Sequence, residues 1–247
     1  MSAAEGMVIV GVDLASQPAA TGLACLRHRG GTWVIDDAGV GAGDEQVHAA
    51  VASAHRAGVD VPFGWPAPFV DLLRAHRTDE VDPALAVDRD WRRPLVWRAT
   101  DLYVHQRTGV APLSVATDKI AYPALRWAGL AAGLRAAGLD MARDGTGAAC
   151  EVYPAAALRI WGLPHRGYKG AAGRGVRARI IAGLGELLPA LHWNGHEQVC
   201  LEQDDALDAV LSAVIAANVA AGQYQPPPAE LRPRALEEGW ICLPLNN

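Results

Sequence analysis

The chain of 247 residues is 51% apolar and carries a formal net charge of −5 at pH 7. This length allows one large α/β domain with a substantial core. No uninterrupted apolar run reaches the roughly 18 residues that a membrane span needs. The acidic balance also argues against an unspecific coat on nucleic acid, because such binding depends on the neutralisation of phosphates.

The four cysteines, Cys25, Cys150, Cys200 and Cys242, lie far apart and form no CxxC pair. This spacing indicates neither a zinc site nor a disulfide framework. The N-terminus lacks the pattern of a secretory signal, because the apolar run Met7–Val12 leads directly into a polar turn. We therefore expect a cytoplasmic protein.

The first 65 residues predict three antiparallel strands, a helix, and a fourth strand parallel to the first. Unbroken Val/Ile runs and a Gly30-Gly31 hairpin turn indicate the strands, and Gly58 ends the helix. The predicted elements are strands at Met7–Leu14, Thr21–Arg27 and Thr32–Ala38, a helix at Asp44–Ala57, and a strand at Val59–Val61.

The middle of the chain is less regular. Residues 67–109 are dense in charge and predict helices and loops that pack on the sheet, and a helix over Ile120–Ala137 follows. Together they form an irregular and helical insertion over residues 67–147. A fifth strand is expected at Ala148–Val152, and Pro154 ends it.

The last part of the chain predicts two helices, Arg177–Leu188 and Glu202–Ala220, joined by a loop that contains His192 and His196. The second helix is Ala-rich and free of Pro and Gly, with apolar side chains at three- and four-residue spacing. Residues 223–247 are expected to form a C-terminal extension with a last short strand at Trp240–Pro244.

Acidic side chains interrupt these apolar elements at five points. They are Asp13 at the end of the first strand, Asp60 in the fourth, Glu151 in the fifth, and Asp205 and Asp208 at one edge of the last helix. Carboxylates in apolar strands are costly unless they are paired, hydrogen-bonded or bound to a cation. A set of oxygen ligands without His or Cys favours Mg²⁺ or Mn²⁺ over zinc. The neighbouring Asp204 is interpreted as a helix cap.

A basic segment forms the strongest charge asymmetry of the chain. No Asp or Glu occurs between Val152 and Gly185, whereas six basic residues fall there: Arg159, Arg166, Lys169, Arg174, Arg177 and Arg179. Glycines around Tyr168 and Lys169 are typical of a pliable loop that closes on a ligand. We expect Lys169 and Arg174 to contact substrate phosphates beside the acidic cluster.

The order of these features resembles the ribonuclease H-like superfamily, and within it the Holliday-junction-resolvase-like branch. The motif series is similar to that of the "domain of unknown function 429" family, whose members are regarded as predicted ribonuclease H-like nucleases. The motifs are Gly11-Val12-Asp13-Leu14-Ala15, Val59-Asp60-Val61-Pro62-Phe63-Gly64, Arg98-Ala99-Thr100-Asp101, Glu151-Val152-Tyr153-Pro154-Ala155, Tyr168-Lys169-Gly170, Asp204-Asp205-Ala206-Leu207-Asp208-Ala209 and Glu238-Gly239-Trp240-Ile241.

The resemblance implies an α/β fold: a single ribonuclease H-like domain over residues 1–247, with a mixed five-stranded sheet in the order 3-2-1-4-5 and helices on both faces. It also implies a nuclease that hydrolyses phosphodiester bonds with two Mg²⁺ or Mn²⁺ ions. Asp13, Asp60, Asp205 and Asp208 match the metal-binding acids of the superfamily, and Asp13 would bridge both ions. Glu151 would complete the catalytic set.

Two further residues are candidates for substrate contact. Trp65 follows Phe63-Gly64 at the mouth of the presumed cleft and suits base stacking. Arg98 either contacts substrate or forms a structural ion pair with Asp101 under the insertion. The expected partner is a nucleic acid, with DNA and RNA both open, and the sequence leaves the oligomeric state open.

Three alternatives compete with a nuclease. An actin-like sugar kinase shares this sheet topology, but its duplicated second lobe has no counterpart after Gly109. A non-catalytic nucleic-acid-binding module would keep the fold without needing the acids. The cluster could also act on, or bind, a small phosphorylated metabolite or nucleotide, which suits the acidic net charge.

Overall fold

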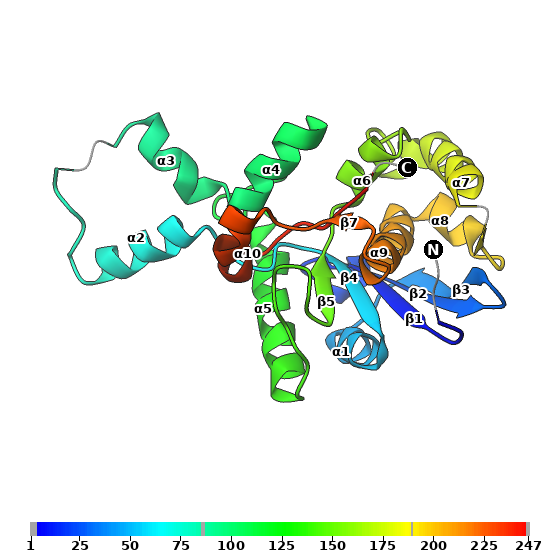
Figure 1. The fold of residues 1–247 in the computed structure, drawn as a ribbon. Coiled ribbons are helices and arrows are strands. Elements are labelled where there is room, and N and C mark those ends of the chain that lie inside the picture. Colours follow the sequence, from blue (N-terminus) through cyan, green and yellow to red (C-terminus); the bar gives the residue numbers. More distant parts are fainter. Residues whose placement is uncertain (1–3, 85–86, 189, 246–247) are drawn as a thin grey trace.

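The computed structural model describes residues 4–84, 87–188 and 190–245. These residues form a mixed six-stranded sheet with helices on both faces and a separate two-stranded sheet (Figure 1). The strands are β1 (Val8–Asp13), β2 (Gly22–Arg29), β3 (Thr32–Val40), β4 (Arg56–Asp60), β5 (Ala149–Glu151), β6 (Leu191–His192), β7 (Tyr224–Gln225) and β8 (Leu243–Pro244). The α-helices are α1 (Asp44–Ser53), α2 (Ala67–Arg77), α3 (Arg89–Val96), α4 (Ala99–Thr108), α5 (Ala121–Ala136), α6 (Pro154–Ile160), α7 (Arg174–Leu187), α8 (Glu197–Glu202), α9 (Asp204–Ala220) and α10 (Arg232–Glu238). Short 3₁₀ turns occupy η1 (Pro18–Ala20), η2 (Ala171–Gly173) and η3 (Ala229–Leu231).

The main sheet has the order β5-β4-β1-β2-β3-β6. The predicted mixed sheet with helices is confirmed, and its five strands lie in the predicted order. The predicted strand count was wrong, because β6 adds a sixth strand parallel to β3. This strand covers only two residues of a segment that we had expected to be a loop. Such a short strand is defined by its partner β3, and no periodic pattern in the sequence announces it.

Several element boundaries also differ from the prediction; helix α7, for example, begins at Arg174 instead of Arg177. Helix α9 begins at Asp204 instead of Glu202, because Gln203 adopts an extended backbone that separates it from α8. Helix α1 ends at Ser53 and β4 begins at Arg56, before the glycine that had been expected to stop the helix. The carboxyl end of β4 at Asp60 is nevertheless close to the expected place.

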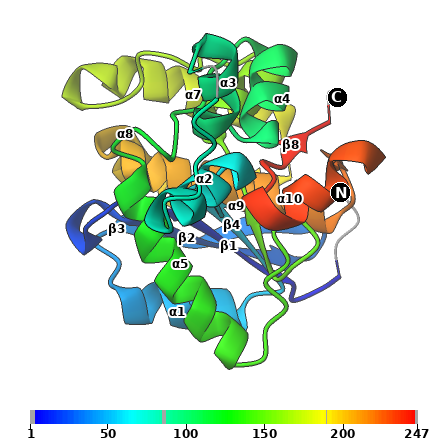
Figure 2. The same cartoon turned by 90° about the vertical axis from the view of Figure 1, so that its left-hand side faces the viewer.

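Side chains of β1 alternate between two apolar clusters, one on each face of the sheet. Ile9 belongs to the cluster on the α9 face, whereas Val10 and Val12 belong to the cluster that α1 and α5 cover. Figure 2 shows α1 and α5 on one side of the sheet and α9 with α7 and α8 on the other. Asp13 has the same parity as Ile9 and therefore points to the α9 face.

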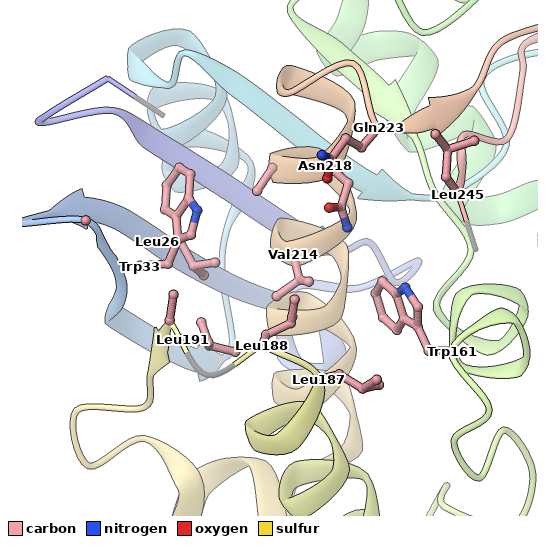
Figure 3. Close-up of a pocket in the computed structure, with 13 residues that line it drawn as sticks. Leu26, Trp33, Trp161, Leu187, Leu188, Leu191, Val214, Asn218, Gln223 and Leu245 are labelled. Atoms are coloured by element: carbon pink, nitrogen blue, oxygen red, sulfur yellow. The ribbon is translucent and has the colours of Figure 1, made fainter. Parts of the chain in front are cut away.

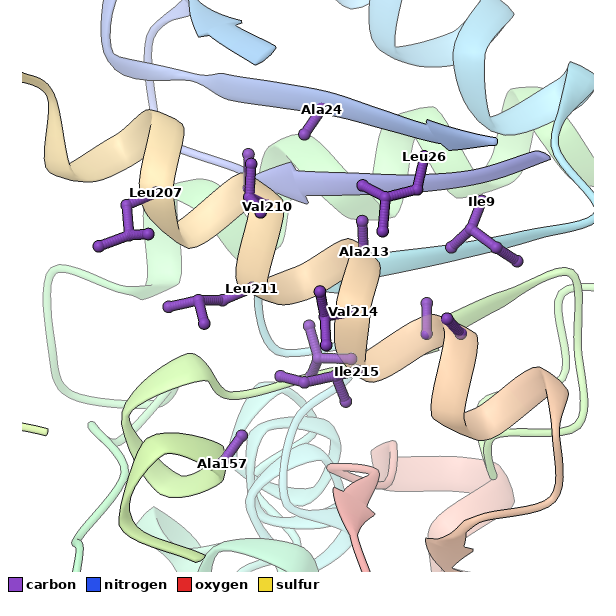
Figure 4. Close-up of a cluster of buried hydrophobic side chains, with 14 of the residues drawn as sticks. Ile9, Ala24, Leu26, Ala157, Leu207, Val210, Leu211, Ala213, Val214 and Ile215 are labelled. Carbon is purple, nitrogen blue, oxygen red and sulfur yellow. The ribbon is translucent and has the colours of Figure 1, made fainter. Parts of the chain in front are cut away.

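Helix α9 is the central element of the core. Every residue from Ala206 to Val219 is buried, and its apolar side chains pack on Ile9, Ala24 and Leu26 of the sheet (Figure 4). The apolar sequence of α9 agrees with its burial, because a helix that other helices and strands cover on all sides needs no polar face.

Three glycines let α9 approach the sheet closely. A Cβ atom on Gly11 would lie 2.0 Å from the carbonyl oxygen of Ala209, and one on Gly58 would lie 2.2 Å from that of Ser212. On β2, a Cβ on Gly22 would lie 2.1 Å from the carbonyl oxygen of Asp205. Since these glycines belong to three adjacent strands, the helix backbone rests directly on the sheet over β2, β1 and β4.

The insertion consists of helices, as predicted. Helix α5 covers the second face of the sheet through Trp127 and Leu134, while α2 and α3 extend away from the body of the molecule (Figure 1). Glu238 anchors the insertion, because its carboxylate accepts hydrogen bonds from the first N–H groups of two helices, Ala67 of α2 at 2.9 Å and Ala99 of α4 at 2.8 Å. A buried carboxylate there satisfies donors that a helix N-terminus leaves free.

The C-terminal extension packs beside β5 instead of forming a strand over Trp240–Pro244. Ile241 forms a parallel bridge with Glu151, and only Leu243–Pro244 forms a strand, β8, which pairs with β7. None of the helices in the described residues is both long and apolar enough to cross a membrane.

The contact between α9 and the sheet predicts the effect of a single methyl group. Gly58→Ala should lower the free energy of unfolding by about 3 kcal/mol, because the new Cβ would overlap the helix backbone and either element must shift. Gly39→Ala is the matched control, since Gly39 lies in β3 with no atom within 4 Å of its added Cβ. Urea unfolding of both variants measures the difference. Equal stabilities would show that α9 can move away from the sheet at little cost.

Candidate active site

Two aspartates meet at the carboxyl ends of neighbouring parallel strands. Asp13 of β1 and Asp60 of β4 are partners in the parallel register of these strands. Both side chains therefore point to the α9 face. The first turns of α9 bring Asp208 to the same place, with a side chain only 1% exposed. We had predicted from the sequence that Asp13, Asp60 and Asp208 meet, and the register of β1 and β4 brings the first two together.

The loop Tyr168–Gly170 supplies a positive charge to this cluster. The ammonium of Lys169 forms an ion pair with Asp208, and it lies 3.7 Å from Oδ2 of Asp13. The Tyr168 hydroxyl donates to Oδ1 of Asp208 at 3.1 Å. Asp208 is thus held from two sides by one loop, and its carboxylate has a fixed orientation.

Arg177 fixes the position of this loop. Its guanidinium is buried and donates to the carbonyl oxygens of Tyr168 and Gly170, the latter at 2.7 Å. It also donates to the carbonyls of Leu201, at 3.0 Å, and Glu202 near the end of α8. These contacts use the charge of Arg177 to join the loop to α8, where cations are favourable.

The glycines of the loop determine its shape. Gly167 and Gly170 have positive φ angles of 73° and 70°, which L-residues with side chains rarely adopt. A Cβ on Gly173 would lie 2.3 Å from the Tyr168 backbone. The sequence analysis took these glycines as a sign of a pliable loop. The structure shows that a tight, packed turn requires the same glycines.

Asp204 is not a simple helix cap, in contrast to our interpretation of the sequence. Its carboxylate accepts a hydrogen bond from the backbone N–H of Gly170 at 3.1 Å and lies 3.8 Å from the Lys169 ammonium. Asp204 thus binds the loop that carries Lys169. Asp205 lies at the edge of the cluster, where its charge adds to the repulsion that acts on Asp13.

Burial and mutual repulsion make the acidic cluster electrostatically expensive. Burial, followed by the charges of Asp208 and Asp60, raises the pKa of Asp13 well above its usual range. The same causes, burial first and then Asp208, raise the pKa of Asp60 to about 8. Burial also raises the pKa of Asp208 despite the opposing effect of Lys169. One ammonium is too little positive charge for this many carboxylates.

Glu151 lines the same cavity as Asp13 and Asp60, but its carboxylate is held in a second network, so its predicted catalytic role stays a prediction. In the parallel register Glu151 pairs with Val59, so it shares the parity of Val59 and points to the face opposite Asp60. Its carboxylate accepts the backbone N–H of Phe63 at 2.9 Å and pairs with Arg98 at 2.7 Å. Glu151 is therefore the partner of an arginine beneath the cleft.

Arg98 occupies the centre of that second network. Its guanidinium is 1% exposed and bonds Asp101 at 2.8 Å, Glu151, and the backbone carbonyl of Glu238. The ion-pair interpretation describes this geometry, and the alternative of direct substrate contact does not, because its donors are already engaged. The network joins β5, α4 and the C-terminal segment next to the cleft.

Neither of the two other predicted substrate contacts is among the described residues that line the cavity beside the cluster. Arg174 is exposed at the start of α7. Trp65 is partly buried and packs on the apolar cluster of the α5 face, and it is not among the described residues that line the cavity beside Asp13 and Asp60. Their roles in binding remain predictions.

The sequence analysis assigned no role to Tyr168 or Arg177, which both act on the site. Arg177 lies three and seven residues before Ile180 and Leu184, on the buried face of α7. A basic residue on an apolar helical face needs partners for its charge, so this spacing could have identified it. Tyr168 lies in a quoted motif, but its bond to Asp208 depends on the tertiary fold.

A cavity of about 310 Å³ opens beside the cluster. Its polar lining consists of Asp13, Asp60 and Lys169 together with Arg98 and Glu151, while Leu113, Pro123 and Tyr153 contribute apolar surface. Burial, with a smaller contribution from Asp60, raises the pKa of Tyr153 to about 12. The cavity therefore presents a neutral phenol and apolar side chains opposite a charged wall.

A divalent cation fits the chemistry of this wall. Its donors are carboxylate oxygens, which Mg²⁺ and Mn²⁺ prefer, and the raised pKa values of Asp13 and Asp60 indicate a deficit of positive charge. As the side chains stand, no group of three or more His, Cys, Asp or Glu in the described residues is arranged to hold an ion. Lys169 contacts Asp208 at the point where the carboxylates converge.

Comparison with protein families identifies the chain. The family model described as "Protein of unknown function (DUF429)" matches residues 11–232. The chain belongs to this family. The resemblance to the DUF429 family is thereby confirmed, and the matched span contains the acidic cluster, the loop with Lys169, and Arg98 with its partners Asp101 and Glu151. No curated protein and no solved structure matches the chain.

The raised pKa of Asp60 predicts that replacing this residue in this DUF429 protein changes the free energy of unfolding by an amount that depends on pH. The carboxyl ionises near pH 4 in an unfolded chain and at about 8 in the fold. As the pH rises between these values, ionisation favours the unfolded chain and the wild type loses stability. Asp60→Asn removes this loss. The free energy of unfolding of the variant minus that of the wild type should therefore increase from about pH 4 to about pH 8 and then level off.

Denaturant unfolding at each pH, with a chelator present, measures this difference. Asp37→Asn is the control, because it removes an exposed carboxyl of β3 and should show no such increase. A difference that is independent of pH would mean that Asp60 is well solvated or well paired in the fold.

Proposed function

We propose that the protein is a ribonuclease H-like nuclease that hydrolyses phosphodiester bonds with Mg²⁺ or Mn²⁺ at Asp13, Asp60 and Asp208. One observation carries this proposal: Asp13 and Asp60 are aligned on adjacent parallel strands and face Asp208 of α9. The order of strands and helices supports it as well, since two of these acids lie on the first and fourth strands and the third on the helix packed against them.

The carboxylates provide a site for cations and the cavity provides a place for substrate. Bound divalent ions supply the means to activate a water molecule and to stabilise the leaving oxygen of a phosphodiester. Asp13, between Asp60 and the helix, is the best placed of the acids to contribute to more than one ion. Asp205 lies at the edge of the set and is the less central ligand.

Lys169 has a second role in this proposal. Its side chain is 53% exposed, so the ammonium can reach both the carboxylates and the cavity. In the free protein it balances part of the charge of Asp208 and Asp13. With substrate present, it is in a position to neutralise a phosphate oxygen. Tyr168 and Arg177 position the loop for this purpose without contacting the reacting atoms.

A second candidate is the hydrolysis or binding of a small phosphorylated metabolite or nucleotide. The volume of the cavity favours it, because about 310 Å³ corresponds to a site for one small ligand. The apolar surface of Pro123 and Tyr153 suits a base or another flat group. This candidate uses the same acids and differs from the first only in the size of the substrate.

Hydrolysis by purified protein tests the proposal. Labelled branched DNA, single-stranded DNA, RNA–DNA hybrid, RNA and free nucleotides are incubated with Mn²⁺ or with a chelator. We expect Mn²⁺-dependent cleavage of at least one substrate. Asp13→Asn should lower its rate by about 100-fold or more, because the variant loses a charged ligand at the centre of the site. Asp37→Asn, which removes an exposed carboxyl, should retain the wild-type rate.

The pattern of substrates separates the candidates. Cleavage of polymers supports the nuclease, and cleavage of nucleotides alone supports the second candidate. Cleavage that survives chelation, or that Asp13→Asn retains, would contradict the metal mechanism. Tight binding of nucleic acid without cleavage in any arm would identify a non-catalytic binding module.

A further inference from the structure

A second and larger cavity lies at the other end of α9. Its volume is about 520 Å³, and it is enclosed by the C-terminal half of α9, the strands β2 and β3, and the ends of α6 and α7 (Figure 3). Leu26, Trp33, Trp161, Leu188, Val214 and Asn218 form much of its lining. The candidate active site lies at the opposite, N-terminal end of α9, where Asp13 and Asp60 line a different cavity.

The walls of this cavity are uncharged, and most of the side chains that form them are apolar. None of the described residues that line it has an ionisable side chain. A charged ligand would lose its hydration there without gaining a counter-charge, which is costly. A cavity of this size, in contrast, suits an uncharged molecule of the size of a typical small ligand. The walls therefore select for neutral, mainly apolar molecules.

Trp33 adds a specific polar contact. Its ring is 3% exposed, and its Nε1–H has no hydrogen-bond partner among the described residues. Figure 3 shows this nitrogen on the side of the ring that faces α9 across the cavity. Buried indole N–H groups usually have a partner, since an unmade bond costs free energy. An acceptor placed in the cavity would remove this cost.

Asn218 presents a second polar group from the opposite wall. It is 7% exposed and lies on a helix that is otherwise almost entirely apolar over this region. The structure shows no hydrogen bond from described residues to its side-chain amide, although its backbone carbonyl accepts from Gln223 at 2.8 Å. Figure 3 shows the Asn218 amide directed toward the cavity.

We propose that this cavity binds a small, uncharged aromatic molecule that carries a carbonyl-type acceptor. Trp33 donates to this acceptor through Nε1, the Asn218 amide faces the ligand from the opposite wall, and the apolar side chains contact the ring. The inference is independent of the proposed hydrolysis, because it uses no residue of the acidic cluster. A ligand there stabilises the folded protein by mass action.

Two matched probes test the proposal: 2-acetylnaphthalene, which has an acceptor, and 2-ethylnaphthalene, which lacks one. Binding to ¹⁵N-labelled full-length protein is followed through the indole N–H signals, and Trp33→Phe assigns the signal of Trp33. Both probes should shift this signal, and the ketone should bind about fivefold more tightly, the value of one net hydrogen bond. Trp33→Phe should abolish this preference and leave the affinity for the hydrocarbon nearly unchanged.

Ala217→Phe is a second variant, because it places a ring in the cavity from α9. It should weaken both probes together. Should either variant fail to fold, the wild-type protein still decides: only the ketone should move the Trp33 N–H proton to lower field, as expected for a new hydrogen bond. Failure of both probes to shift the Trp33 signal would overturn the proposed site. A preference for the ketone that persists in Trp33→Phe would overturn the role of Trp33.

Discussion

The close contact between α9 and the sheet is the constraint on which the rest of the structure depends. Gly11, Gly22 and Gly58 remove the side chains that would otherwise separate helix and strands. The backbone of α9 can therefore lie on β2, β1 and β4, and its first turns reach the carboxyl ends of β1 and β4. Without that contact, Asp208 would not meet Asp13 and Asp60. The same packing buries the acids and raises the pKa of each.

The buried acids have positively charged partners of two different kinds, one on each face of the sheet. On one face, Arg98 satisfies Glu151 and Asp101 completely, and the result is a closed network that joins the insertion to β5. On the other face, Lys169 balances the carboxylates only in part and remains half-exposed. A network whose carboxylates are all hydrogen-bonded suits a structural role, whereas a cluster with one ammonium for several carboxylates beside a cavity suits a cation and an anionic substrate.

Local patterns predicted the five main strands and placed Asp13, Asp60 and the α9 acids at strand ends and at one helix edge. The order of the strands was implied by the family resemblance. The sequence did not predict β6, whose two residues have no period. The contacts of Glu151 were not predicted, because its register with Val59 sets the face to which it points and residue type does not show this register. The contacts of Asp204, Tyr168 and Arg177 depend on how the loop of residues 168–170 folds back on α9, which no local pattern specifies.

A crystal structure with Mn²⁺ tests the central claim most directly. The anomalous signal of manganese locates the ion without reference to activity. The account predicts one or two strong peaks within coordinating distance of Asp13, Asp60 and Asp208, with the Lys169 ammonium displaced from Asp208, and the loss of at least one peak in Asp13→Asn. Clear density for Lys169 on Asp208, with no peak at the cluster under Mn²⁺ concentrations that support hydrolysis, would contradict it.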